Sequence, residues 1–178
     1  TAAGNTITAL TVDAATDLTA ALVVGDYAST AALTVTGAGK VNLGNGFDGA
    51  TINASTNTGG LTISTTAGVT SSVIGSAGND VVTVVGALTA TGSMNLGAGD
   101  DKLLAGAAAS VLATNTIDGG AGFDTVAASL INATNAAKFV NFEALDLSSN
   151  ATLDVALVTG STITGLTLSG GAGVVTSL

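Results

Sequence analysis

The sequence predicts an all-β protein folded as a parallel β-solenoid, and two features carry this prediction. Short stretches in which apolar and polar residues alternate recur about every ten residues, each bounded by Gly, Asn, Ser or Asp. Two-residue hairpin signals such as Asn-Gly are nearly absent, although antiparallel strands would need them. A sandwich of antiparallel strands is the alternative, and the missing hairpin turns weaken it.

The alternating stretches mark the expected strands. They are residues 6–12, 33–37, 40–44, 61–66, 81–86, 93–97, 115–120, 143–149 and 161–171. In a solenoid, each strand stacks on the equivalent strand of the previous rung, and the apolar side chains form one continuous core.

The segment 131–148 breaks this rhythm, since it contains Phe139, Phe142 and the only glutamate. One interpretation is a short helical turn or irregular flap that packs through its phenyl rings, with Thr134 or Asn135 as its cap. The other interpretation is a rung lengthened by an insertion.

Composition indicates a folded chain with little charge. Of its 178 residues 47% are apolar and 8% are charged, and Cys and His are absent. This length suits one solenoid domain over residues 1–178, which we expect to be a fragment of a larger chain. Because the net charge is −9, nucleic acid and anionic membrane surfaces are poor partners. No apolar run is long enough to insert into a membrane.

Four glycine-rich turns carry an acid at a shared position. They are GNGFDGA (44–50), GSAGNDVVT (75–83), LGAGDDKLL (96–104) and GGAGFDTVA (119–127), with the acids Asp48, Asp80, Asp101 and Asp124. Glycine allows positive φ and close backbone approach, so that successive carbonyl oxygens point to alternate sides of a turn. Carbonyl and carboxylate oxygens, without His or Cys, suit Ca²⁺ and exclude a zinc or copper site. Residues 44–127 are therefore predicted to be a calcium-binding section.

The last of these turns resembles the nonapeptide G-G-x-G-x-D-x-U-x of calcium-binding RTX repeats, where U is a large apolar residue. The other turns depart from it, at Ser76, at Leu96 and most strongly at residues 49–50. Tandem RTX turns lie about 18 residues apart. Here the steps are 101 − 80 = 21 and 124 − 101 = 23, which one slightly larger rung would accommodate. The step 80 − 48 = 32 fits neither one rung nor two, and leaves the register of the first turn open.

In RTX-like rolls a calcium ion lies between successive turns, and the resemblance implies two such ions here. The first would take Asp80, Asp101 and the carbonyl oxygens of Gly75, Ala77, Gly97 and Gly99. The second would take Asp101, Asp124 and the carbonyl oxygens of Leu96, Ala98, Gly120 and Gly122. Without a counter-ion, acids stacked about 4.8 Å apart would repel one another. Asp100 and Asn79 are expected to face water. The alternative interpretation is that these turns are solvated loops without metal.

Degenerate RTX turns in an acidic chain that lacks Cys and is rich in Ala, Thr, Val and Gly resemble the body of bacterial surface-layer proteins and large RTX adhesins. The phrase FEALDLSSNATL (142–153) resembles a strand that recurs in those chains after a calcium turn. The family implies secretion, folding on calcium outside the cell, and self-association into a lattice or fibre at the bacterial surface. It also implies lipopolysaccharide as an anchoring partner for the rest of the chain.

Two other classes of function compete with a structural surface-layer module. An enzyme is not expected, because the chain has no His or Arg, one Tyr (Tyr27) and three scattered Lys to serve as base or charge stabiliser. The second competitor is a calcium-dependent adhesin or a glycan- or ice-binding solenoid. Thr-x-Thr pairs are present but do not recur at rung spacing, so the strand propensity of Thr explains them better.

Overall fold

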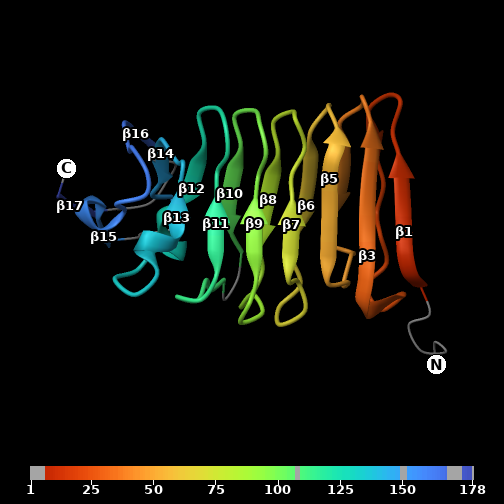
Figure 1. The fold of residues 1–178 in the computed structure, drawn as a ribbon, viewed down its shortest axis with the longest axis horizontal. Helices are drawn as coiled ribbons and strands as arrows, with labels where there is room; N and C mark the ends of the chain where they lie inside the picture. Colours follow the sequence, from red (N-terminus) through yellow and green to blue (C-terminus); the bar gives the residue numbers. More distant parts are fainter. Residues whose placement is uncertain (1–6, 107–108, 149–151, 168–173, 178) are drawn as a thin grey trace.

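The chain forms a parallel β-solenoid of about seven turns (Figure 1). The structure is a computed structural model, and it describes residues 7–106, 109–148, 152–167 and 174–177. All strand pairs in the described part of the chain are parallel, and no α-helix is found there. The predicted all-β solenoid is therefore confirmed, and the antiparallel sandwich is wrong.

Two long sheets make up the solenoid, and the chain alternates between them. The seven-stranded sheet contains β1 (Ile7–Asp13), β3 (Tyr27–Gly37), β5 (Thr51–Asn57), β7 (Ser72–Ile74), β9 (Ser93–Asn95), β11 (Thr116–Asp118) and β13 (Phe139–Val140). The eight-stranded sheet contains β2 (Leu18–Thr19), β4 (Val41–Gly44), β6 (Leu61–Ser64), β8 (Val81–Val84), β10 (Lys102–Ala105), β12 (Thr125–Ala127), β14 (Ala144–Asp146) and β16 (Gly165–Thr167). A separate pair is formed by β15 (Thr152–Asp154) and β17 (Val174–Ser177). Of the strand expected at 161–171, residues 168–171 lie outside the described residues.

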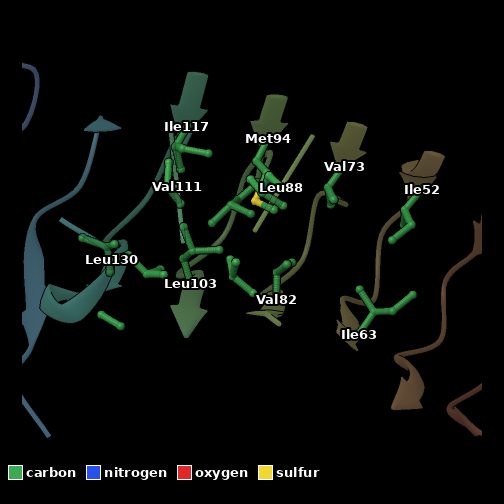
Figure 2. Packing of buried hydrophobic residues seen from close by; sticks show 14 of the residues in the cluster. Ile52, Ile63, Val73, Val82, Leu88, Met94, Leu103, Val111, Ile117 and Leu130 are labelled. Atoms are coloured by element: carbon green, nitrogen blue, oxygen red, sulfur yellow. The ribbon is translucent and has the colours of Figure 1, made fainter. Parts of the chain in front are cut away.

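Register between neighbouring strands sets the length of a rung. Leu33 pairs with Ile52, a step of 52 − 33 = 19 residues, and Met94 pairs with Ile117, a step of 117 − 94 = 23. The inward residues of both sheets are apolar and almost fully buried. Figure 2 shows Val73, Met94 and Ile117 of one sheet facing Val82 and Leu103 of the other. Because the rungs keep register, these side chains form one core along the solenoid.

The C-terminal part of the segment 131–148 contributes β13 and β14 to the two sheets, whereas its N-terminal part, residues 131–138, forms an irregular connection. It is preceded by the 3₁₀ turn η1 (Ala128–Leu130), and it contains a second 3₁₀ turn, η2 (Ala136–Lys138). Phe139 and Phe142 are 0% exposed, and their ring centroids lie 6.3 Å apart in the core. Asn135 precedes η2, but its side chain makes no cap hydrogen bond to that turn.

The connections between the two sheets lie at opposite edges of the solenoid. We name the turns that follow the seven-stranded sheet the acidic edge: residues 14–17, 38–40, 58–60, 75–80, 96–101, 119–124 and 141–143. We name the turns that return from the eight-stranded sheet the amide edge: residues 20–26, 45–50, 65–71, 85–92, 109–115 and 128–138.

Candidate metal centre

Three of the predicted acids, Asp80, Asp101 and Asp124, lie on consecutive rungs of the acidic edge. The residues that follow them, Val81, Lys102 and Thr125, are register partners in β8, β10 and β12. All three acids are 0% exposed. A chain with few charges thus buries a column of carboxylates at one edge.

Backbone N–H groups of neighbouring rungs satisfy one oxygen of each acid in this column. The amide of Asp80 donates to Oδ1 of Asp101 at 2.7 Å, and the amide of Asp101 donates to Oδ1 of Asp124 at 2.8 Å. At the ends of the column, Leu61 N donates to Oδ1 of Asp80 at 2.5 Å, and Asp124 N donates to Oε2 of Glu143 at 2.8 Å. The carboxylates therefore cap the neighbouring turns as well as carrying charge.

Asp80 differs from the other two acids in the hydrogen bonding of its second carboxylate oxygen. Oδ2 of Asp80 accepts a hydrogen bond from Ser76 N at 2.6 Å, and the Ser76 hydroxyl lies 2.7 Å from Oδ1. Oδ2 of Asp101 and Oδ2 of Asp124 are buried, and no described residue donates to either. A buried carboxylate oxygen without a donor is costly, so each needs a proton or a cation.

The same burial changes the acidity of the column. Desolvation, together with the charges of Asp80, Asp124 and Asp100, raises the pKa of Asp101 to about 7, although the hydrogen bond from Asp80 N opposes the shift. Desolvation also raises the pKa of Asp124 to about 6, with Glu143 as the main contributing charge. Burial raises the pKa of Asp80 as well, but the hydrogen bonds from Ser76 oppose the shift. Ionised together near neutral pH, these acids favour a positive counter-ion.

Glycine is required where the backbones of successive turns touch. Gly97 and Gly120 have φ of 102° and 98°, and a Cβ on either would overlap a carbonyl oxygen of the turn before it, that of Ser76 or of Gly97. The turns also pair directly, since Ala121 N donates to Gly97 O and Gly99 N donates to Ala121 O, both at 2.9 Å. At these positions, successive acidic turns are therefore in direct backbone contact, with no side chain between them.

The residues that the sequence assigns to the second ion fit a cation with oxygen ligands. Three carboxylates, those of Asp48, Asp101 and Asp124, have a buried oxygen to which no described residue donates, and the last two belong to that set. In the described turns, the carbonyl oxygens of Ala98, Gly120 and Gly122 accept no backbone hydrogen bond. The set assigned to the first ion fits less well, because both oxygens of Asp80 have donors. Among the described residues, no group of three or more His, Cys, Asp or Glu side chains converges as a metal cluster.

Known proteins do not identify the chain. Comparison with protein families, curated proteins and solved structures finds no match. Within the described residues, no helix is long and apolar enough to cross a membrane. Function must therefore be inferred from the edges and faces of the solenoid.

Asp48, the fourth predicted acid, lies at the amide edge and not in the acidic column. It follows β4 of the eight-stranded sheet, and its Oδ2 accepts a hydrogen bond from Gly25 N at 2.8 Å. The step of 32 residues to Asp80 is about one and a half rungs of 19–23 residues, which places the two acids on opposite edges. Asp48 therefore cannot share an ion with the other three.

Asn57 is a functional residue of the acidic edge that the sequence analysis missed. Its amide Nδ2 lies 3.0 Å from the carbonyl oxygens of both Gly37 and Gly39, in the preceding turn. Its Oδ1 accepts hydrogen bonds from Gly59 N and Gly60 N, in its own turn. At this rung an amide, which is both donor and acceptor, holds two turns together without any charge. The Asn-x-Gly-Gly sequence about one rung before residues 75–80 was the available signal.

Asn79 and Asp100 lie outside the buried column, as residues next to the acids. Asp100 N donates to Oδ1 of Asn79 at 2.9 Å, and Phe123 N donates to Oδ1 of Asp100 at 2.9 Å. Both contacts are exposed to solvent. These side chains therefore face water, as expected, and also link successive turns.

Buried amide side chains stabilise the turns of the amide edge. Asn115 Nδ2 donates to Thr89 O at 2.8 Å, and Asn135 Nδ2 donates to Val111 O at 2.7 Å. Their Oδ1 atoms accept hydrogen bonds from Leu112 N and Asn132 N, respectively. Both asparagines are 0% exposed. Asn115 and Asn135 thus link rungs of the amide edge as Asn57 does, through neutral groups, whereas Asp48 of the same edge uses a carboxylate.

Proposed function

We propose that the solenoid is a structural module of a secreted, self-assembling bacterial cell-surface protein, and that calcium at the acidic edge stabilises it. The observation that carries the calcium part is the pair of buried oxygens, Oδ2 of Asp101 and Oδ2 of Asp124, for which no described residue is a donor. Hard oxygen ligands in a chain without His or Cys suit Ca²⁺.

Asp101, Asp124 and the carbonyl oxygens of the turns 96–101 and 119–124 would hold this ion. Bound there, calcium supplies the positive charge that the buried carboxylates need when they are ionised. A site assembled from two rungs does not exist in the unfolded chain, so its binding free energy adds to the stability of the fold. Between Asp80 and Asp101, Ser76 already donates to one carboxylate, so we propose weaker binding there.

The experiment is thermal unfolding in calcium and in chelator, followed by circular dichroism. Chelation should lower the melting temperature of the wild-type chain, and isothermal titration should detect Ca²⁺ binding. In Asp101→Asn, the added calcium should raise the melting temperature far less. Asp17→Asn is the matched control, because Asp17 is an exposed acid in the first turn of the acidic edge, where its Oδ1 accepts a hydrogen bond from Lys40 N. The response of this variant to calcium should equal that of wild type. Identical melts of the wild-type chain in calcium and in chelator would refute the site.

The cell-surface part of the proposal rests on the resemblance of the turns to RTX repeats and surface-layer proteins. It includes self-association into a lattice or fibre and anchoring to lipopolysaccharide. Electron microscopy of the full-length protein in calcium should show ordered sheets or filaments. A full-length protein that stays monomeric in calcium at high concentration, by light scattering, would favour an adhesin. We also propose that the module is not catalytic, since it has no His or Arg. Hydrolysis or elimination of a polysaccharide by the purified chain would contradict this.

A further inference from the structure

A groove of about 520 Å³ crosses the outer face of the seven-stranded sheet. Its floor is formed by β7, β9 and β11, which are neighbours in the sheet (Figure 1), and its wall by η2 and β13. Three groove residues, Ile74, Asn95 and Asp118, directly precede acidic turns, but the calcium proposal does not use them.

The floor carries polar side chains in register across the rungs. Ser72 pairs with Ser93, and Ser93 pairs with Thr116, so one row presents a hydroxyl on each of three rungs. A second row consists of Ile74, Asn95 and Asp118. Adjacent strands are about 4.8 Å apart, so hydrogen-bonding groups recur at that interval along the groove.

The wall brings a positive charge to this floor. Lys138 lies at the end of η2, and its backbone N–H donates to Asn135 O at 2.8 Å. Asn135 is itself fixed in the structure, because its side chain donates to Val111 O and Leu130 O. Lys138 is one of only three basic residues in the chain. The groove therefore combines hydroxyl, amide, carboxylate and ammonium groups on a fixed frame.

We propose that this groove binds an extended, hydroxyl-rich saccharide. Each saccharide ring offers several hydroxyl groups that both donate and accept, which matches Ser93 and Thr116 of the first row and Asn95 of the second. Oδ1 of Asp118 already accepts hydrogen bonds from Gly120 N and Asn141 Nδ2, so its Oδ2 accepts the hydrogen bond of a sugar hydroxyl. Lys138 donates to ring or hydroxyl oxygens. The apolar C–H face of a ring packs against Ile74, whose side chain is 39% exposed, and against Val140.

Other classes of ligand fit the groove less well. A peptide strand could not pair with the floor, because the backbone groups of β7, β9 and β11 are engaged in the sheet. Nucleic acid needs several cations and stacking aromatic rings, and the lining has one lysine and no aromatic residue. An apolar ligand would leave the polar floor without partners.

The test is heteronuclear NMR of the calcium-loaded chain with four tetrasaccharides at millimolar concentration: cellotetraose, maltotetraose, chitotetraose and tetragalacturonate. Binding of at least one should shift the amide signals of Ser93, Asn95, Thr116 and Lys138. Ser93→Trp, at an exposed position, should block the groove without unfolding the sheet, and the dispersed spectrum would show that the fold is retained. Lys138→Gln should weaken binding about tenfold, through loss of a charged donor.

Lys102→Gln is the matched control, because Lys102 is an exposed lysine on β10 of the other sheet, and it should leave affinity unchanged. No shift in the groove with any of the four saccharides would overturn the proposal. Binding that survives Ser93→Trp would also overturn it. Shifts at these same amides with a decapeptide of Thr and Val, and none with saccharide, would reassign the groove to peptides. Repeating the titrations in chelator separates these outcomes from calcium binding at the acidic edge, because saccharide binding that is the same with and without calcium belongs to the groove alone.

Discussion

The two edges of the solenoid solve the same stacking problem with different chemistry. At the amide edge, Asn115 and Asn135 use both ends of a neutral amide to join successive turns. At the acidic edge, Asp101 and Asp124 accept backbone hydrogen bonds through Oδ1, but a carboxylate has no N–H to offer in return. Their Oδ2 atoms are left buried and without a donor in the described structure.

This difference shows which edge can respond to its surroundings. A neutral amide keeps its hydrogen bonds at any ordinary pH and needs no ion. A buried carboxylate must bind a proton or a cation, so the stability of the acidic edge depends on pH and metal. Asn57 shows that the acidic edge could have used amides throughout, since it joins two acidic-edge turns without charge.

The largest expected effect concerns how closely the turns approach. Gly120 and Gly25 have φ of 98° and 93°, but a Cβ would overlap Gly97 O at the first and meet nothing within 4 Å at the second. Gly120→Ala should therefore cost at least about 4 kcal/mol of unfolding free energy. Gly25→Ala should lower the unfolding free energy by only about 1–2 kcal/mol, the cost of placing an L-residue in a left-handed backbone conformation. Denaturant unfolding measures both, and equal losses would show that the acidic turns can move apart freely.

Converting an amide to an acid should expose the difference between the edges. In Asn135→Asp, the carbonyl oxygens of Val111 and Leu130 lose their donor, and a charge is buried. The unfolding free energy should fall by about 3 kcal/mol. Calcium should not restore it, since no second acid stacks on this position. Asn132→Asp is the control, because Asn132 is exposed and uses only its acceptor oxygen. Denaturant unfolding that shows calcium rescuing the Asn135 variant would contradict the comparison.

The pH dependence of stability should reverse with calcium. Burial raises the pKa of Asp101 from 3.8 to about 7 and the pKa of Asp124 from 3.8 to about 6. Between the ordinary pKa of each acid and its raised value, the folded chain therefore holds more protons than the unfolded chain. In metal-free buffer this stabilisation is complete below the ordinary pKa and is lost as pH rises through about 6 and 7. Melting temperature should then be higher at pH 5 than at pH 8 by about 5 °C.

With calcium, the melting temperature should instead be higher at pH 8 than at pH 5, because the metal binds the ionised carboxylates. In the double variant Asp101→Asn, Asp124→Asn, the melting temperature should depend little on pH, either without or with calcium, since an amide does not titrate in this range. Melting temperatures of the metal-free wild type that increase from pH 5 to pH 8 would show that the buried acids are not protonated there.

The parallel solenoid and the acidic column could be predicted because both are specified locally. Each of the three Gly-x-Asp turns of the acidic column precedes an apolar strand, and the steps of 21 and 23 residues match the observed rungs. The sequence analysis does not predict β5 and β7, because neither strand shows a sustained alternation of apolar and polar residues. Only Ile52 and Ala54 of β5, and Val73 of β7, are both apolar and buried. In these strands, pairing with neighbours on both sides outweighs a weak alternation.

The placement of Asp48 and the role of Ser76 could not be predicted from the turn pattern. A Gly-x-Asp sequence specifies a turn, but which sheet precedes it depends on the register of the whole chain. The serine was interpreted as a departure from the RTX pattern. The structure shows that it donates to Asp80, so its effect depends on a contact between residues four apart in a folded turn.

The smallest expected effect comes from restoring glycine at that position. Ser76→Gly removes the hydroxyl donor to Oδ1 of Asp80, while Leu61 N and the backbone N–H of residue 76 still donate to Oδ1 and Oδ2, so Asp80 loses one of its three donors. In chelator the variant should be less stable than wild type by about 1 kcal/mol, the usual contribution of one hydrogen bond. In calcium the loss should shrink, because a carboxylate with one fewer hydrogen-bond donor is a better ligand for a cation. Calorimetric titration should then show tighter or additional Ca²⁺ binding relative to wild type. An equal loss with and without calcium would mean that the hydroxyl only fills space, and that the donors of Asp80 do not set which rungs bind metal.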